Sequence, residues 1–237
     1  MSDLKKIIRE TKSHENKAQA AVLRRFFKTA PGQYGAGDKF LGLYVPLQRS
    51  LAHKYAGLPL NEVKVLLNSQ IHEFRLMALM ILVRRYQQAV SRIEQKKIVD
   101  FYLRQTTRIN NWDLVDLSAP KILGDYLLDD AQAMKVLGRL AASNNLWERR
   151  IAMVSTYAFM KRGRSQEAIA VAEKLLDDKH DLIHKAVGWM LRELGKQVDK
   201  KLLLNFLDEY YRTMPRTALR YAIERLSPSE RAHYLTK

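Results

Sequence analysis

The stretch HKAVGWMLREL at residues 184–194 returns as RTALRYAIERL at residues 216–226, an offset of 32 residues. Two further segments, LWERRIAMV at 146–154 and DLIHKAVGW at 181–189, lie 35 residues apart. In each segment the apolar residues recur every three or four positions, which is the period of an amphipathic α-helix. A helix pair repeated about every 35 residues is typical of a helical solenoid. The sequence therefore predicts an all-α fold, an α-α superhelix of HEAT-like or related repeats.

The helical period continues along the whole chain, and no stretch alternates polar and apolar residues as a half-buried strand would. The 10 Gly and 6 Pro are too few to punctuate an all-β protein. We expect one domain over residues 1–237. The predicted helices cover residues 3–12, 15–28, 46–55, 60–69, 71–88, 92–106, 112–127, 131–141, 147–162, 165–176, 180–194, 198–212, 215–226 and 228–235.

Composition excludes several classes of protein. The chain has no cysteine, so it has no disulfide framework, no thiolate metal site and no cysteine nucleophile. Its first residues, MSDLKKIIRETKS, carry charges where a signal peptide would be apolar. The longest apolar run, Leu76 to Val83, is far shorter than the ~20 residues that cross a bilayer. We expect a soluble, cytoplasmic protein.

The charge of the chain favours a polyanionic partner. Lys and Arg total 41 against 25 Asp and Glu, a formal net charge of +16. Such a surface suits nucleic acid, whereas basic residues scattered over many helices do not suit a membrane-bound amphipathic helix. Basic residues recur at matching repeat positions, which predicts a basic concave face that follows a phosphate backbone. The alternative is that each is an ordinary solvated residue. The recurring residues are Arg75, Arg149, Arg150, Lys185 and Arg216.

Two other features have plainer interpretations. Residues 29–45 form the one long irregular stretch, and Gly35–Gly37 within it lacks the spacing of a phosphate-binding loop. We interpret it as a connector beside the concave face. His180 and His184 have the i,i+4 spacing of zinc-binding helices, but no general-base Glu lies between them and no third ligand lies nearby. We therefore expect no metal and no cofactor.

The segment NNWDLVD, residues 110–116, holds the most unusual constellation of residues. Trp112 and Asp116 stand one helical turn apart and share a face. Pro120 cannot donate to the carbonyl of Asp116 and its ring crowds that group, so the helix should kink or restart there. A tryptophan beside a carboxylate at a bent helix suggests a site. The alternative is a core tryptophan with a capping aspartate.

The other two tryptophans fall at comparable repeat positions. Trp147 lies 35 residues after Trp112, and Trp189 belongs to the turn AVGWMLRE. The small side chains of Ala186 and Gly188 in that turn allow either another helix or a ligand to come close.

Four segments together resemble the HEAT-like-repeat alkylpurine DNA glycosylases of the AlkD family. They are FFKTAPGQYGAGDKFLGLYVP, NNWDLVDLSAPKILGDYL, NNLWERRIAM and HKAVGWMLREL, and the resemblance covers nearly the whole chain. It implies that Asp116 is the catalytic carboxylate, that Trp112 and Trp189 lie beside the lesion, and that Arg150 contacts the DNA backbone. Lys185 is assigned to DNA as well, with a purely structural role as its alternative. Phe26 is a departure, because some members have a tyrosine there.

The resemblance implies hydrolysis of the N-glycosidic bond of cationic N3- or N7-alkylpurines in double-stranded DNA, as in base excision repair. The expected protein is a monomer of the bacterial cytoplasm, at the nucleoid, without membrane, metal or cofactor. Two alternatives remain at this stage: a non-catalytic repeat protein that binds damaged or branched DNA, and a protein-interaction scaffold, against which the charge argues.

Overall fold

The computed structural model describes residues 1–236. The described residues form α-helices and two 3-10 turns, with one isolated bridge between Lys39 and Ile71 and no strand, which confirms the all-α prediction. The chain folds as two compact units, Met1–Ser118 and a second unit that begins at Ala119, and each is described by itself. That residues 1–237 form a single domain stays a prediction.

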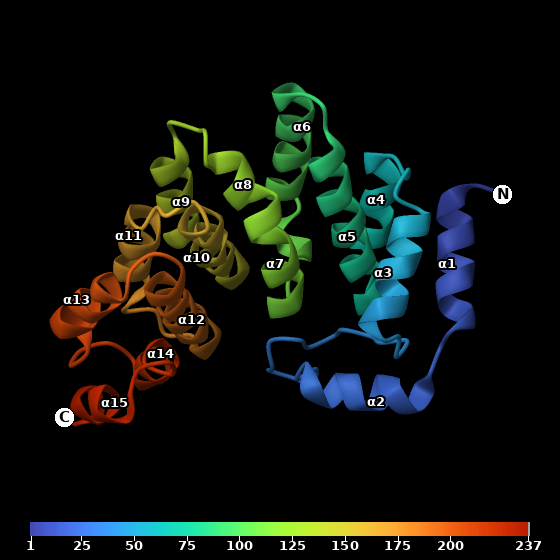
Figure 1. Cartoon of the computed structure of the whole chain (residues 1–237). Helices are drawn as coiled ribbons and strands as arrows, with labels where there is room; N and C mark the ends of the chain where they lie inside the picture. The colour runs from blue at the N-terminus through green and yellow to red at the C-terminus, as the bar shows by residue number, and fades with distance from the viewer. Residues whose placement is uncertain (237) are drawn as a thin grey trace. The chain divides into compact units, whose positions relative to one another are not determined.

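The first unit contains seven helices among its described residues, several of them upright in Figure 1, with α2 running across them. They are α1 Asp3–Ser13, α2 Lys17–Phe26, α3 Val45–Lys54, α4 Leu60–Leu67, α5 His72–Gln88, α6 Arg92–Leu103 and α7 Trp112–Ser118, with a 3-10 turn at Thr106–Arg108. Helix α5 is the centre of the unit, because it packs against α3, α4, α6 and α7. The apolar run Leu76–Val83 lies within it and is buried throughout.

The irregular stretch before α3 is held against the start of α5. The backbone N–H groups of Lys39 and His72 donate to the carbonyls of Gln70 and Lys39, at 3.0 and 2.8 Å. The fully buried carboxylate of Glu73 accepts the N–H groups of three successive residues, Leu41 to Leu43, at 2.8 to 3.4 Å. The connector that the sequence predicts is therefore anchored at one end by a buried carboxylate.

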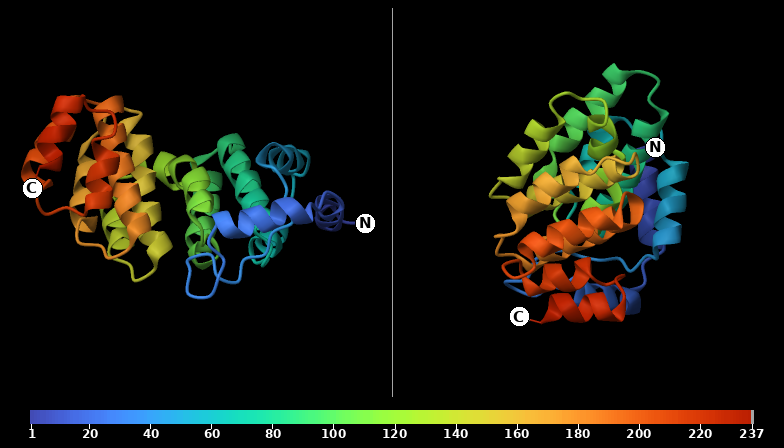
Figure 2. Two further views of the ribbon diagram at one scale, coloured as in Figure 1. Left: turned by 90° about the horizontal axis from the view of Figure 1, so that it is seen from below. Right: turned by 60° about the vertical axis from the view of Figure 1, so that its left-hand side comes forward.

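The second unit is a regular series of packed helices (Figures 1 and 2). Helices α10, α12 and α14 begin at Leu146, Asp181 and Arg216, each 35 residues after the one before. They pack against one another in that order, and α9, α11 and α13 pack against them. This confirms the predicted period. The elements of the unit are a 3-10 turn at Ala119–Lys121, α8 Leu123–Leu127, α9 Ala133–Ala141, α10 Leu146–Met160, α11 Gln166–Leu175, α12 Asp181–Gln197, α13 Lys200–Tyr210, α14 Arg216–Ala222 and α15 Pro228–Leu235.

Gly188 on α12 shows why the repeat segments contain small residues. A Cβ atom added there would lie 2.3 Å from the carbonyl oxygen of Ala218 and 2.6 Å from Cβ of Tyr221, both on α14. The sequence allowed either another helix or a ligand to come close to Gly188. The structure places another helix, α14, against it.

The helix predicted over residues 112–127 is interrupted at Pro120, as expected. Helix α7 ends at Ser118, a 3-10 turn covers Ala119–Lys121, and α8 begins at Leu123. The boundary between the two units falls at this interruption. Within residues 1–236, no helix is both long enough and apolar enough to span a bilayer.

Candidate active site

The predicted site residues fall into two groups. Trp112 and Asp116 lie on α7 of the first unit, whereas Arg150 lies on α10, and Lys185 and Trp189 on α12, of the second unit. The structure thus places two of them on one short helix and three on two neighbouring helices.

The start of α7 is fixed by the residue before it. Asn111 is fully buried, and its side-chain oxygen accepts the backbone N–H of Trp112 at 2.8 Å. Its carbonyl oxygen accepts the N–H of Val115. Side-chain oxygens in this position satisfy N–H groups that have no partner inside the helix. Trp112 therefore has a defined backbone position at the N-terminus of α7.

The indole of Trp112 belongs to an aromatic cluster. It stacks on Phe27 with ring centroids 5.4 Å apart, and the ring of Phe26 meets it edge-on at 5.9 Å. Its Nε1–H donates to the hydroxyl of Tyr34 at 3.2 Å. Phe26 is 60% exposed. Together Trp112 and Phe26 present a partly exposed aromatic surface.

A buried histidine lies behind this cluster, where sequence reasoning did not place one. His72 is 2% exposed and stacks on Phe40 and against Phe27, each with centroids 4.8 Å away. Its two ring nitrogens face carboxylates, with Nε2 2.8 Å from Asp113 and Nδ1 3.3 Å from Asp38. His72 therefore links α7 to the irregular stretch before α3.

Two cationic and two anionic side chains form one network around His72. Arg75 donates to Asp38 at 2.6 Å, so the described network comprises Asp38, His72, Arg75 and Asp113. Burial alone would lower the pKa of His72, but the charge and hydrogen bond of Asp113, together with the hydrogen bond of Asp38, raise it to about 9. His72 is thus an imidazolium at neutral pH and donates to both carboxylates.

Asp116 lies one turn after Trp112 and is partly exposed. Its negative charge acts on the buried hydroxyl of Tyr102. Burial is the larger cause that raises the pKa of Tyr102, Asp116 raises it further, and the hydrogen bond with Ser118 opposes both. An anionic carboxylate beside an aromatic surface can stabilise a positive charge or orient a water molecule.

The three predicted residues of the second unit have different environments. Arg150 is 5% exposed and donates to the carbonyl of Leu182, at the start of α12, at 2.6 Å. Lys185 pairs with Asp181 one turn earlier at 2.8 Å, and Trp189 is half-buried. The contacts of these three residues with DNA stay predictions. The side chain of Arg150 is almost entirely buried within the fold.

The predicted basic row along the repeats is wrong for two of its members. Arg75 is 2% exposed and belongs to the buried network, and Arg149 pairs with Asp178 at 2.5 Å. Both also donate to the carbonyl of the serine six residues earlier, Ser69 or Ser143, at 2.9 and 3.0 Å. Their recurrence follows from this shared structural role, because each arginine closes the loop that precedes its helix.

The histidine pair of α12 also has a structural role. His180 caps the helix, and its Nδ1 accepts the N–H of Leu182 at 3.1 Å. Burial is the main cause that lowers the pKa of His180, which suits an accepting neutral ring. His184 hydrogen-bonds through Nε2 to the carbonyl of Asp178. The described residues contain no group of three potential metal ligands.

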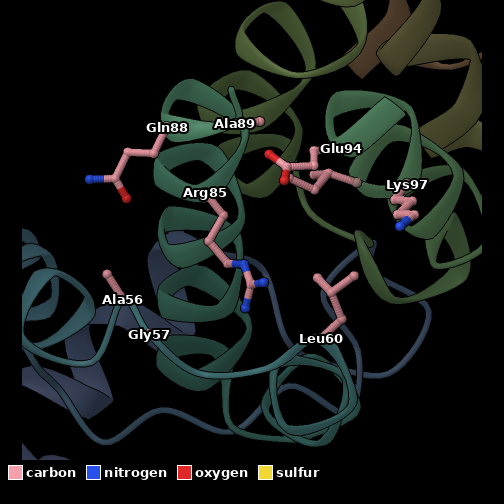
Figure 3. A pocket seen from close by; sticks show the side chains of 9 residues that line it. Ala56, Gly57, Leu60, Arg85, Gln88, Ala89, Glu94 and Lys97 are labelled. Carbon is pink, nitrogen blue, oxygen red and sulfur yellow. The ribbon is translucent and has the colours of Figure 1, made fainter. Parts of the chain in front are cut away.

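Two hollows lie on the surface of the first unit. One, of about 410 Å³, is lined mainly by α5, α6 and the segment before α4 (Figure 3). Two of its charged groups have partners within the fold, since Arg85 donates to the carbonyl of Leu58 and Glu94 accepts the N–H of Val90. The other, of about 540 Å³, lies at the C-terminal half of α2 and the residues that follow it. It is lined by Ala21, Arg24, Arg25, Thr29, Ala30 and Gln33.

Comparison with known proteins adds two findings. A family model described as DNA alkylation repair enzyme matches residues 7–226. A solved structure described as a predicted DNA alkylation repair enzyme from Enterococcus faecalis superposes with a TM-score of 0.72, over 91% of this chain and 98% of that one. At 18% identity this likeness concerns the fold, and it agrees with the predicted all-α superhelix. No curated protein matches the chain.

Proposed function

Because the chain belongs to the DNA alkylation repair enzyme family, we propose that it is a DNA glycosylase for purines that carry a positive charge after alkylation at N3 or N7. The family supports a role in the repair of alkylated DNA. The observation that carries the finer proposal is the placement of Asp116 one turn from Trp112, whose indole is held by Phe27 and Tyr34 beside the exposed ring of Phe26.

The proposed reaction needs one carboxylate and one water molecule. The bond from the sugar C1′ to the purine nitrogen breaks, and the base leaves with the electron pair as a neutral alkylpurine. Positive charge develops on the sugar as the base departs, and the anionic Asp116 stabilises it. The water oxygen then bonds to C1′ while its proton passes to Asp116. No cofactor takes part in this scheme.

The aromatic surface contributes in a second way. The face of an indole attracts a cation by roughly 0.5–2 kcal/mol, depending on how well water is excluded. Trp112 offers such a face to the cationic base or to the electron-poor sugar, and Phe26 shields one side of it. On the resemblance of their segments, Trp189 is proposed as a second aromatic contact, and Arg150 and Lys185 as backbone contacts.

The distribution of charge supports duplex DNA as the partner. The first unit has 20 Lys and Arg against 10 Asp and Glu, and the remainder of the chain has 21 against 15. Both parts are therefore positive, with +10 and +6, and the more positive one contains Trp112 and Asp116. A phosphate backbone rewards this excess because bound counterions are released. We propose that a single copy of the chain suffices for the reaction.

The decisive experiment compares Asp116→Asn with the wild type on methylated duplex DNA. We expect the wild type to release alkylpurine and leave abasic sites, and the variant to do so at least about 10²-fold more slowly. Asp100→Asn, which removes a carboxylate from a surface ion pair with Lys96, is the matched control and should keep full activity. If the wild type releases no base but binds the duplex, the protein is a non-catalytic DNA-binding member. If both variants act like the wild type, Asp116 is not the catalytic carboxylate.

A further inference from the structure

Helix α2 presents three different faces. Ala20, Leu23 and, just beyond the helix, Phe27 pack into the aromatic cluster. Val22 and Phe26, one turn apart, are 57% and 60% exposed and form an apolar edge. The remaining surface is basic, and α2 contains no acidic residue. A helix whose solvent side is divided into an apolar edge and a basic edge suits a ligand that is itself part apolar and part anionic.

The basic edge lines the hollow of about 540 Å³ at the C-terminal half of α2. Arg24 and Arg25 are exposed, and within residues 1–236 neither guanidinium has an acidic partner. Their position in the last turn of α2 favours cations, because the helix carbonyls there are partly negative. The hollow in Figure 3 differs, since its basic side chains share the lining with Glu94. Of the two hollows, only the one at α2 combines two arginines without a neighbouring carboxylate in its lining.

The far wall of this hollow is held in shape by local hydrogen bonds. The hydroxyl of Thr29 donates to the carbonyl of Arg24 at 3.2 Å, and the side-chain oxygen of Gln33 accepts the N–H of Ala30 at 3.1 Å. Because the side-chain oxygen of Gln33 already accepts a hydrogen bond, the NH₂ group of the same side chain is the part that can donate to a ligand. The lining therefore offers two guanidinium groups and an amide as donors, a set that suits a tetrahedral oxyanion.

We propose that this hollow binds one backbone phosphate of the DNA strand that carries the damaged nucleotide. Arg25, which lines the hollow, is the chain neighbour of Phe26, whose ring meets that of Trp112 at 5.9 Å, so the basic edge of α2 lies next to its apolar edge. A phosphate held there by guanidinium groups, in charge-assisted and bidentate hydrogen bonds, would place the adjoining sugar against Phe26. The proposal rests on the proposed function in that DNA is the ligand.

The first test measures binding to an undamaged duplex, so that it does not depend on base release. We expect Arg24→Gln combined with Arg25→Gln to bind about tenfold more weakly, the usual scale for losing a hydrogen bond to a charged group. The slope of log affinity against log salt should fall by about 0.9, the value for one phosphate. The control pair Arg9→Gln with Arg49→Gln removes the same charge from exposed positions on α1 and α3. Equal losses in both pairs would mean that net charge acts, and not this hollow.

The second test locates the phosphate. Neutral methylphosphonate replaces each phosphate in turn around a non-cleavable analogue of the damaged nucleotide. For the wild type we expect one position near the lesion to cost about tenfold in affinity, and for the Arg24 and Arg25 double variant no further loss at that position. At every position, the affinity lost on methylphosphonate substitution could instead be the same in the wild type and in the double variant. The arginines would then contact no single phosphate, and the proposal would be wrong. Neither outcome depends on whether Asp116 catalyses base release, which is measured separately.

Discussion

The two units of this protein bury charge in different ways. In the second unit the buried charged side chains Arg150, Glu167 and Glu193 lie on three successive helices, α10 to α12, and have separate partners. In the first unit four charged groups meet in one buried network, where His72 joins Asp38 to Asp113 and Arg75 pairs with Asp38. The second unit is a regular repeat, and the first has a specialised interior.

The difference indicates where the fold is under functional demand. Burying ions costs several kcal/mol each unless their partners are well placed, so a cluster of buried ions needs each of its members in position. The network lies directly behind Trp112, through the stacked rings of Phe27 and His72. We infer that it holds the start of α7, and thereby the aromatic surface, in place.

The largest expected effect comes from removing one member of the network. Asp38→Ala would leave the buried charges of His72 and Arg75 without their shared carboxylate, and we expect a loss of about 3–5 kcal/mol in unfolding free energy. The counterpart in the second unit is Glu167→Ala, because Glu167 is equally buried but its partner Arg164 is half exposed and can turn to water. Urea denaturation followed by circular dichroism should show the smaller loss there. A smaller loss for Asp38→Ala would show that the network is no more critical than an isolated pair.

The second expected effect is a dependence of stability on pH that originates in the first unit. The pKa of His72 is raised from 6.5 to about 9, so folding favours its protonated form. The stabilisation is complete below pH 6.5, declines as the pH rises, and is lost once the pH passes about 9; it amounts to roughly 3 kcal/mol. The charged groups that face the ring are Asp38, Asp113 and Arg75.

The measurement compares wild type and His72→Gln between pH 6 and pH 9.5. The difference between their unfolding free energies should shrink as the pH rises, because only the wild type loses a proton from residue 72. Titrations elsewhere, including those of exposed lysines, cancel in this difference. A difference that stays constant with pH would show that His72 is neutral in the folded protein.

The sequence predicts the regular unit better than the specialised one. The period of 35 residues and the break at Pro120 depend on local patterns, and both are confirmed. The network depends on Asp38, in an irregular stretch, meeting His72, 34 residues later in the chain, and no periodicity encodes that contact. Of the site, the i,i+4 spacing identified Trp112 and Asp116, whereas the neighbours that fix Trp112 became visible only in the structure. Arg75 lies in the buried network and not on a basic face, because recurrence at a repeat position marks structural as well as functional residues.

The smallest expected effect tests the packing of the regular unit. In Gly188→Ala the new methyl group would meet the backbone of α14, and the strain should cost about 1–3 kcal/mol in unfolding free energy. The matched control is Gly138→Ala on α9, where an added Cβ meets nothing within 4 Å. That change should instead stabilise the protein by about 0.5–1 kcal/mol, since alanine is the better helix former. Thermal denaturation would therefore shift in opposite directions for the two variants. A shift in the same direction would mean that α12 and α14 can move apart freely, and that the regular unit is held by its larger side chains and not by the close approach at Gly188.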